Sequence, residues 1–214
     1  MVMHLKSRVA GIAMGAFLVT GAACQEPAIM KTVRALYNGK TPVETGFDLY
    51  IVWKVREKKE SKSGRLIMAP GDKFRAELGA QTWVCDGRTY WEASRDGNNV
   101  QVVIKRAADV DLSMHPSQVL HTYLEKFSFA LKERKGDLTT VEWKADSLSE
   151  TAGAASIDLS INATSGVITA LRIVDKDGNE SAYQFKKTKF PAKLPDSTFE
   201  YAVPKGASVL DMRN

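Results

Sequence analysis

The sequence predicts a mainly β protein built on one antiparallel sheet of about ten strands, with only two short helices. Three observations favour this fold class. Apolar and polar residues alternate with a period of two along most of the chain. Turn motifs rich in glycine, aspartate and asparagine separate the alternating stretches. No fixed-period repeat, low-complexity tract or linker divides the chain, so we expect residues 24–214 to form a single domain.

Residues 1–23 are interpreted as a signal peptide that is removed on export. Lys6 and Arg8 precede an apolar stretch of mostly small residues at 9–19, and three small residues at 21–23 form a suitable cleavage site. No later stretch approaches the roughly 20 apolar residues that a membrane-spanning helix needs. We therefore expect the mature chain in the periplasm, either soluble or held to the envelope by a lipid.

Cleavage after residue 23 would leave Cys24 at the N-terminus. Small residues followed by this cysteine are similar to the bacterial lipobox, in which the cysteine is acylated, although Gly21 stands where that motif usually has leucine. Lipidation of Cys24 and ordinary cleavage therefore both stay open. A disulfide between Cys24 and Cys85 is ranked last, because two cysteines do not make a disulfide framework.

Strands are expected, in chain order, where the alternation is sustained and turn motifs bound it. The basic cluster of Lys58, Lys59 and Lys62 is expected in a loop. The turn motifs are RDGNN (95–99), RKGD (134–137), TSG (164–166) and DKDGN (175–179). The predicted strands cover residues 47–55, 74–78, 82–85, 88–93, 100–104, 141–145, 155–161, 167–173, 183–185 and 199–201.

Two segments have the apolar spacing of an amphipathic helix. The first covers residues 29–37, between Pro27 and Gly39, and the second covers residues 119–127, after Pro116. A sheet with a long apolar face and so little helix must bury that face against another layer, close into a barrel, or curve around something.

The segment TWVCDGRTYWEAS (82–94) is expected to form a hairpin with a two-residue turn at Asp86-Gly87. This loop length would pair Cys85 with Arg88, which places Cys85 on a mixed, outward face. The opposite, uncharged face is then expected to be buried. It carries Thr82, Val84, Thr89, Trp91 and Ala93.

No catalytic or metal-binding group of residues accompanies Cys85. Arg88 opposite the thiol would lower its pKa, but catalysis also needs a base, and nothing ties His115 or His121 to Cys85. The two histidines and the spare cysteine lack the close spacing of metal ligands. No P-loop, GxGxxG, GxSxG or HExxH motif occurs. We therefore expect no enzymatic activity, no metal and no cofactor.

Three stretches are similar, in order and spacing, to the periplasmic lipoprotein carrier family of the LolA type. They are APGDKFRAEL (69–78), WVCDGRTYWEAS (83–94) and the C-terminal stretch 174–211. The resemblance implies an open half-barrel made of one curved antiparallel sheet, two or three short helices covering its concave face, and a cavity that takes acyl chains. The residues that carry the resemblance are Pro70, Phe74, Arg75, Asp86, Gly87, Trp91, Asp196, Phe199, Pro204 and Gly206.

Two departures from the family pattern bear on function. Family members carry a basic residue just before the proline, implicated in holding the lid, whereas Ala69 precedes Pro70 here. They also lack a lipidated N-terminus. The sequence around Cys24 is similar to that of a lipidated cysteine, which the related outer-membrane acceptor of the LolB type carries. The chain therefore resembles the superfamily more closely than one partner role within it.

From this resemblance we expect a monomer that binds acyl chains of lipoproteins or lipids and carries them across the periplasm towards the outer membrane. Its partners would be an inner-membrane donor and an outer-membrane acceptor. Because a cavity wall and a packed core have the same composition, an ordinary core stays open for each lining residue. The residues expected to line the cavity are Phe47, Leu49, Ile51, Trp53, Leu66, Met68, Phe74, Leu78, Val84 and Trp91 on the sheet, and Leu36, Leu120, Tyr123, Leu124 and Phe127 on the helices.

Other functions stay open beside the carrier. The chain could be an outer-membrane acceptor or an envelope assembly lipoprotein anchored through Cys24, and a cysteine-dependent enzyme acting through Cys85 is the least supported. A nucleic-acid partner is not expected. The mature chain has 28 basic and 25 acidic residues, and this net charge of +3 is small and dispersed.

Overall fold

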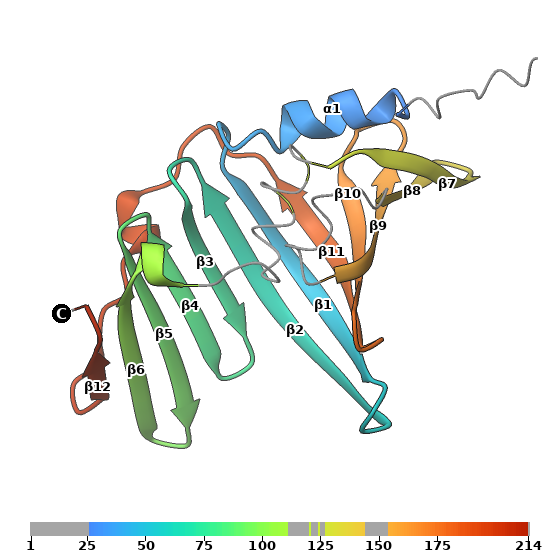
Figure 1. The fold of residues 1–214 in the computed structure, drawn as a ribbon. Helices are drawn as coiled ribbons and strands as arrows, with labels where there is room; N and C mark the ends of the chain where they lie inside the picture. Colours follow the sequence, from blue (N-terminus) through green and yellow to red (C-terminus); the bar gives the residue numbers. More distant parts are fainter. Residues whose placement is uncertain (1–25, 111–119, 121–123, 125–126, 144–153, 214) are drawn as a thin grey trace, which may run out of the picture.

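The computed structural model describes residues 26–110, 120, 124, 127–143 and 154–213. Most of these residues belong to one 12-stranded sheet, whose strand order is β12-β6-β5-β4-β3-β2-β1-β11-β10-β9-β8-β7 (Figure 1). The sheet does not close, and β12 and β7 are its edges. The strands are β1 (Val43–Trp53), β2 (Lys58–Ala69), β3 (Lys73–Leu78), β4 (Gln81–Asp86), β5 (Thr89–Asp96), β6 (Asn99–Arg106), β7 (Phe129–Lys135), β8 (Leu138–Trp143), β9 (Ala154–Asn162), β10 (Ile168–Asp175), β11 (Glu180–Lys189) and β12 (Ser208–Asp211).

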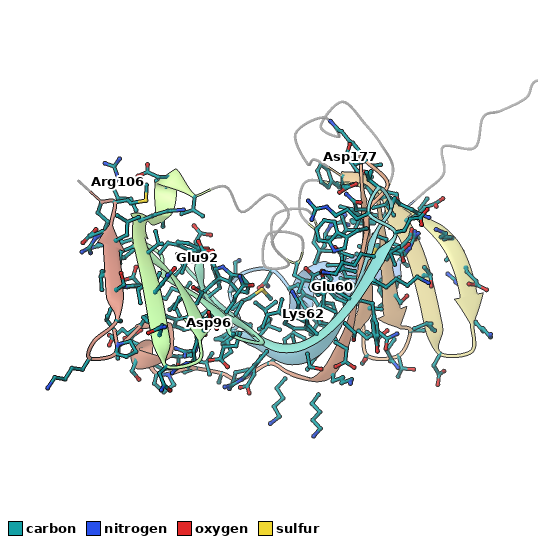
Figure 2. All side chains as sticks on the ribbon, turned by 90° about the horizontal axis from the view of Figure 1, so that it is seen from below. Glu60, Lys62, Glu92, Asp96, Arg106 and Asp177 are labelled. Carbon is teal, nitrogen blue, oxygen red and sulfur yellow. The ribbon has the colours of Figure 1, made fainter. Side chains whose placement is uncertain are left out.

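The sheet curves strongly, so that one face is concave (Figure 2). We call this the inner face and the opposite one the outer face. Phe47 and Leu49 of β1 are buried on the inner face, and Asp48 between them points to the outer face. The prediction of a single, open, mainly β sheet is confirmed. The prediction that it is wholly antiparallel is wrong, because β12 pairs with β6 in parallel.

Most predicted strands are present, and three strands were missed. The missed ones are β2, β7 and β12, and the predicted strand at 199–201 is wrong because a 3-10 turn, η4 (Asp196–Phe199), ends there. The predicted loop at Lys58, Lys59 and Lys62 lies instead in β2. Local alternation gives no signal for this charged half of β2. It is held by full-length pairing with β1 and by ion pairs along its own strand.

The hairpin of β4 and β5 forms with a register different from the predicted one. Cys85 pairs with Tyr90, not with Arg88, because the loop consists of residues 87 and 88. The Asp86 carboxylate accepts hydrogen bonds from the backbone N–H groups of Arg88 and Thr89, both at 2.7 Å, and so draws Arg88 into the turn. The observed register differs from the predicted one by two residues. Because side chains alternate with a period of two, the same residues still share each face of the hairpin, as predicted.

The first predicted helix is confirmed as α1 (Ile29–Leu36), which lies across one end of the sheet (Figure 1). Met30 and Val33 are fully buried, and the N–H of Ile168 donates to the Tyr37 hydroxyl just after the helix, at 3.2 Å. The second predicted helix, at 119–127, lies largely outside the described residues, as do residues 1–23, Cys24, His115, His121 and Tyr123. A short 3-10 turn, η1 (Ala107–Asp109), follows β6.

The C-terminal segment covers much of the outer face. Leu194 and Phe199 pack on Ile67 and Ala69 of β2. Tyr201 and Ala207 pack on a second outer cluster formed by Trp91, Ala93, Val100, Val102 and Ile104. The Leu66–Ala69 end of β2 and the Val84–Cys85 end of β4 are therefore buried on both faces, whereas the alternation in the sequence predicts one buried face for β4.

Candidate functional site

The largest group of buried apolar side chains lies on the inner face of the sheet, between the strands and α1. We call it the inner cluster. It joins strands that are far apart in sequence, and Leu120, Leu124 and Phe127, which belong to no strand, cover it. Its buried members are Met30, Val33, Tyr37, Val43, Phe47, Leu49, Leu66, Met68, Phe74, Ala76, Cys85, Tyr90, Leu120, Leu124, Phe127, Phe129, Val141, Trp143, Ala154, Ile157, Leu159, Ile161, Ile168, Leu171, Ile173 and Tyr183.

The structure brings most of the predicted lining residues together in or against the inner cluster. Leu36, Ile51 and Leu78 are partly buried and pack against it. Trp53 is half-buried at the far end of β1, outside the clusters that the described residues form, and the centroid of its ring lies 5.9 Å from the Arg56 guanidinium carbon. The residues inside the cluster are Phe47, Leu49, Leu66, Met68, Phe74, Leu120, Leu124 and Phe127.

Val84 and Trp91 lie on the outer face and are corrected here. The two residues pair with each other, and Trp91 packs in the outer cluster. Cys85, predicted on an outward face, is 2% exposed and belongs to the inner cluster, where it pairs with Phe74. The prediction took the face without charges to be the buried one. Because the C-terminal segment covers the outer face, both faces of this hairpin are buried and the absence of charge does not distinguish them.

The inner cluster is an environment that disfavours charge. Burial raises the pKa of Tyr183 to about 12, and burial raises the pKa of Tyr90 as well. Burial also raises the pKa of the Cys85 thiol, and the Asp86 and Asp72 carboxylates add to this effect. The prediction that Arg88 would lower this pKa is therefore wrong. A buried, protonated thiol does not have the character of a nucleophile.

One buried polar side-chain atom of the inner cluster, the Trp143 indole nitrogen, has no hydrogen-bond partner among the described residues. Trp143, at the end of β8, is 7% exposed, and its indole Nε1 is the buried side-chain nitrogen or oxygen without a hydrogen bond among the described residues. Its ring packs on Phe127, with centroids 4.8 Å apart. A buried donor without an acceptor destabilises a fold by about 1–3 kcal/mol. The sequence analysis predicted the strand that carries Trp143, but the local pattern gives no sign that its indole N–H is buried without an acceptor among the described residues.

Arg34 of α1 joins the helix to the segment that closes the inner cluster. Its Nε donates to the Leu124 carbonyl at 2.5 Å, and its Nη2 donates to the Phe127 carbonyl at 2.8 Å. Glu26 pairs with the guanidinium and also accepts a hydrogen bond from the Phe129 N–H at 3.1 Å. The sequence resemblance implies a basic lid residue just before the proline, where this chain has Ala69. A basic side chain does contact the closing segment, but it comes from α1.

A charged rim borders the inner face at the far end of the β1–β2 hairpin. Lys58, Glu60 and Lys62 share the face of Leu49 and Ile51, which lie opposite Lys62 and Glu60 (Figure 2). Glu60 accepts from Lys58 at 2.9 Å and from Lys62 at 3.2 Å. These ammonium groups lower the pKa of the Glu60 carboxyl to about 2. The apolar surface therefore ends in paired charges rather than in bare hydrocarbon.

The described residues offer neither a metal site nor a membrane-spanning helix. No group of three or more histidine, cysteine, aspartate or glutamate side chains comes together within them in a way that would hold an ion. No helix in that same part of the chain is both long enough and apolar enough to cross a bilayer. What the described site offers is apolar surface, one unpaired donor and a closing segment held by hydrogen bonds.

Comparison with known proteins agrees with this arrangement. The model of the outer membrane lipoprotein carrier protein LolA family matches residues 52–202. An outer-membrane lipoprotein carrier protein of Chromobacterium violaceum is 29% identical over 196 residues, 88% of this chain and 90% of that protein. One from Vibrio cholerae is 33% identical over 132 residues, 61% of this chain and 62% of that protein.

Among solved structures, an uncharacterized conserved protein from Thermus thermophilus superposes with a TM-score of 0.54. The two share 16% sequence identity over 86% of this chain and 96% of the other, so this likeness shows the fold alone. The family model covers well over half of the chain, and the Chromobacterium relative is matched over nearly its whole length. The chain belongs to the LolA family of outer-membrane lipoprotein carrier proteins, which are transport proteins and not enzymes.

Proposed function

We propose that this protein binds the acyl chains of lipoproteins between the inner face of the sheet and the covering segments, and carries them across the periplasm. The observation that carries the proposal is the inner cluster itself. It is a continuous apolar surface on an open, curved sheet, and it is closed by a helix and by Leu120, Leu124 and Phe127 rather than by a second sheet. Displacing Leu120, Leu124 and Phe127 would expose part of this apolar surface.

The free energy of hydration explains why such a carrier is needed. Each methylene left in water costs about 0.8 kcal/mol, so a chain with about 12 exposed methylenes costs roughly 10 kcal/mol. A triacylated cargo has three such chains. The carrier needs no reactive residue to move it. It needs an apolar surface whose cover opens at lower cost than the chains' exposure, and an acceptor with higher affinity to receive the cargo.

The unpaired Trp143 indole gives the proposed site a polar feature. Acyl chains are joined to their protein or glycerol through ester or amide groups, whose carbonyl oxygens accept hydrogen bonds. We expect the Trp143 N–H to donate to such a carbonyl, which would satisfy a donor that the described residues leave without an acceptor. The residues proposed to line the site are Leu36, Phe47, Leu49, Ile51, Leu66, Met68, Phe74, Leu78, Leu120, Tyr123, Leu124 and Phe127.

Two alanines that are equally buried on opposite faces allow a matched test. Ala76 lies in the inner cluster and Ala93 in the outer cluster, and each is 4% exposed. Phenylalanine at either position overpacks its cluster and should lower the free energy of unfolding by about 1–3 kcal/mol. We expect Ala76→Phe to weaken binding of a fluorescent fatty-acid probe, and Ala93→Phe to leave it unchanged. Equal binding by both variants, or exclusion of all acylated probes by the parent protein, contradicts the proposal.

The N-terminal sequence supports a second role, that of an acceptor anchored in the outer membrane. Cys24 follows small residues as a lipidated cysteine does, and export by a signal peptide at 1–23 would deliver it to the periplasm. Mass spectrometry of the protein taken from its own envelope reports N-terminal acylation and any bound lipid together. If the anchored role is right, Cys24→Ala releases the protein from the membrane. An unmodified Cys24, or a distribution that Cys24→Ala leaves unchanged, favours the soluble carrier.

A further inference from the structure

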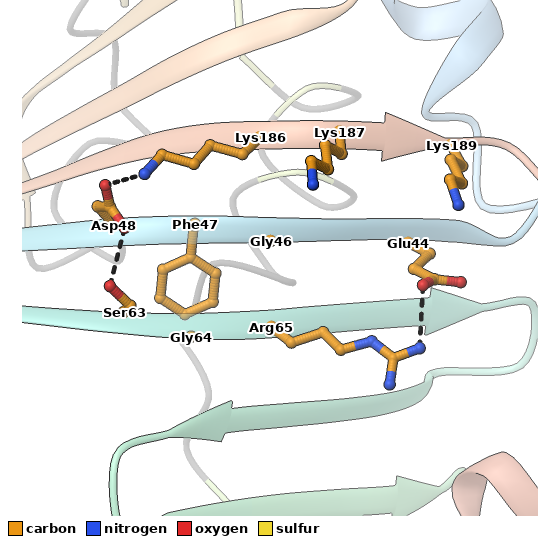
Figure 3. Close-up of a pocket in the computed structure, with 10 residues that line it drawn as sticks. All are labelled: Glu44, Gly46, Phe47, Asp48, Ser63, Gly64, Arg65, Lys186, Lys187 and Lys189. Atoms are coloured by element: carbon orange, nitrogen blue, oxygen red, sulfur yellow. Dashed lines mark hydrogen bonds and ion pairs between the residues drawn. The ribbon is translucent and has the colours of Figure 1, made fainter.

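A second candidate site lies on the outer face, on the side of the sheet opposite the inner cluster. It is a groove of about 390 Å³ where β2, β1 and β11 run side by side (Figure 3). We call it the outer groove. Its charged residues are Glu44, Asp48, Arg65, Lys186, Lys187 and Lys189. This volume is at the lower end of the range for small-ligand sites.

A β-bulge turns an additional lysine toward the outer groove. Gly46 pairs with Lys186 and Glu44 pairs with Lys189, so two steps along β1 match three along β11. The additional residue is Lys187, whose φ is +53°. Strict alternation would point Lys186 and Lys189 to opposite faces. With the bulge, Lys186, Lys187 and Lys189 all line the same groove (Figure 3).

The left-handed conformation of Lys187 is unfavourable by itself. For a residue with a side chain it costs roughly 1–2 kcal/mol, whereas glycine adopts it freely. A bulge that served only the curvature of the sheet would be more stable with glycine at this position. Strained residues of this kind are concentrated at binding sites, where the direction of the side chain matters.

The charges of the outer groove do not balance. Asp48 accepts from Lys186 and from Ser63, and Glu44 accepts from Arg65 at 2.9 Å (Figure 3). Both carboxylates therefore already have cationic partners. Within the described part of the chain, no ion pair joins Lys187 or Lys189 to a carboxylate. Four cationic side chains face two carboxylates, which leaves an excess of two positive charges.

The floor of the outer groove is open at Gly46. A Cβ there would meet only the carbonyl oxygens of Lys186 at 3.6 Å and Gly64 at 3.8 Å, which is ordinary contact. The packing of the sheet therefore does not require glycine at this position. Glycine inside a strand costs about 0.5–1 kcal/mol relative to alanine, and one often marks a place where a ligand approaches the backbone closely.

We propose that the outer groove binds a phosphate group, carried either by a lipid headgroup or by a soluble phosphate ester. A phosphate can accept hydrogen bonds from several ammonium groups at once. An acidic peptide fits less well. The backbone of β1 beneath it is already paired on both sides, with β2 and β11, so an extended peptide would find no main-chain partner. This site is independent of the acyl-chain site proposed on the inner face.

The variants for the test follow from the bulge. Lys187→Gly removes a charge, and glycine adopts the left-handed backbone conformation of this position freely. The fold should therefore be retained or stabilised. Combined with Lys189→Gln, it removes both unpaired lysines. Gly46→Val fills the floor without touching a charge. Arg134→Gln/Lys135→Gln, which removes two exposed positive charges on the β7 edge, is the control for net charge. All chains carry Cys24→Ser, so that no N-terminal lipid contributes to membrane binding.

Binding is measured by NMR titration with inorganic phosphate, and by flotation with phosphatidylcholine vesicles with and without phosphatidylglycerol. We expect the Lys187→Gly/Lys189→Gln pair to weaken phosphate binding by roughly tenfold, the effect of about 1.4 kcal/mol, and Gly46→Val to weaken it as well. Arg134→Gln/Lys135→Gln should bind as the parent does. If the variants lose binding to phosphatidylglycerol vesicles, the ligand is a lipid headgroup. If they lose only the binding of inorganic phosphate, the ligand is a soluble phosphate ester.

Three results overturn the proposal. The first is no saturable response of the parent protein to phosphate or to phosphatidylglycerol vesicles. The second is binding that Lys187→Gly/Lys189→Gln and Arg134→Gln/Lys135→Gln weaken equally, which would reflect net charge alone. The third is a stronger response to an acidic peptide than to phosphate at the same ionic strength. The thermal unfolding of Lys187→Gly verifies that any loss of binding is not a loss of fold.

Discussion

The Arg34 side chain donates a hydrogen bond from Nε to the backbone carbonyl of Leu124 at 2.5 Å. The two residues are 90 positions apart, and they join α1 to the segment that closes the inner cluster. Phe127 and Glu26 complete the coordination of the same guanidinium. If acyl chains enter the inner cluster, this closing segment has to move, and the Arg34 contacts have to break with it.

Replacing Arg34 therefore tests how the site is closed. Arg34→Met keeps an apolar stem but removes every donor, and hydrogen bonds to charged groups contribute about 1.5–3 kcal/mol each. We expect faster release of a bound fatty-acid probe in stopped flow, and faster hydrogen exchange of the Phe129 amide that Glu26 holds. Arg134→Met, on the exposed part of β7, is the control. Lower stability with an unchanged release rate would mean that Arg34 only supports the fold.

Two glycines on neighbouring strands should respond oppositely to alanine. A Cβ on Gly64 would lie 2.5 Å from the Phe47 ring and 2.5 Å from the Glu77 carbonyl oxygen, so the strands would have to separate. Gly64→Ala should lower the free energy of unfolding by about 1–3 kcal/mol. Gly46→Ala meets only ordinary contacts and should raise it by about 0.5–1 kcal/mol. Urea unfolding of both variants measures this, and the same sign for both contradicts the close packing of Gly64 against Phe47.

The strands that the sequence predicts well are those with one apolar face. In β1, Phe47 and Leu49 alternate with polar residues because one face is buried and the other is exposed, and this is the case in which a period of two is informative. The charged half of β2 has no such alternation, since Lys58, Glu60 and Lys62 satisfy one another within the strand. Its partner, β1, determines its structure, and a local pattern cannot show this.

The assignment of faces failed where distant segments meet. Val84 and Cys85 are adjacent and both are buried, one beneath the outer face and one beneath the inner face. The outer cover comes from residues 194–207, whose irregular, proline-containing sequence gives no sign of where it packs. Arg34 and the Lys187 bulge were missed for the same reason. Their roles depend on partners that lie 90 and more than 140 residues away in sequence.

The buried tyrosines predict a loss of stability in alkali. The pKa of Tyr183 is raised by burial from 10.0 to about 12, and its ring packs on Phe47 with centroids 5.5 Å apart. The folded state keeps the proton that the unfolded state loses. The contribution of protonated Tyr183 to the free energy of unfolding is therefore fully present below pH 10 and is lost as the pH rises from 10 to about 12.

Tyr183→Phe removes this linkage. At about 1.4 kcal/mol per pKa unit, the decrease in unfolding free energy between neutral and strongly alkaline pH should be smaller by up to about 3 kcal/mol. Urea unfolding across this pH range measures the slope. Part of the decrease should persist in Tyr183→Phe, because burial also raises the pKa of Tyr37 to about 12. An identical slope in Tyr183→Phe and the parent contradicts a buried, protonated Tyr183.

Trp143→Phe separates the proposed polar contact from simple packing. The exchange keeps an aromatic ring against Phe127 and removes an N–H that has no acceptor among the described residues, so the free protein loses no hydrogen bond seen there. We expect affinity for a ligand with an ester or amide carbonyl to fall about three- to tenfold, since a neutral hydrogen bond contributes about 0.5–1.5 kcal/mol. Affinity for a hydrocarbon-only ligand should not change. Trp91→Phe, on the outer face, controls for loss of an indole. Equal losses for both ligands would assign Trp143 to packing alone, because only a contact with the carbonyl distinguishes them.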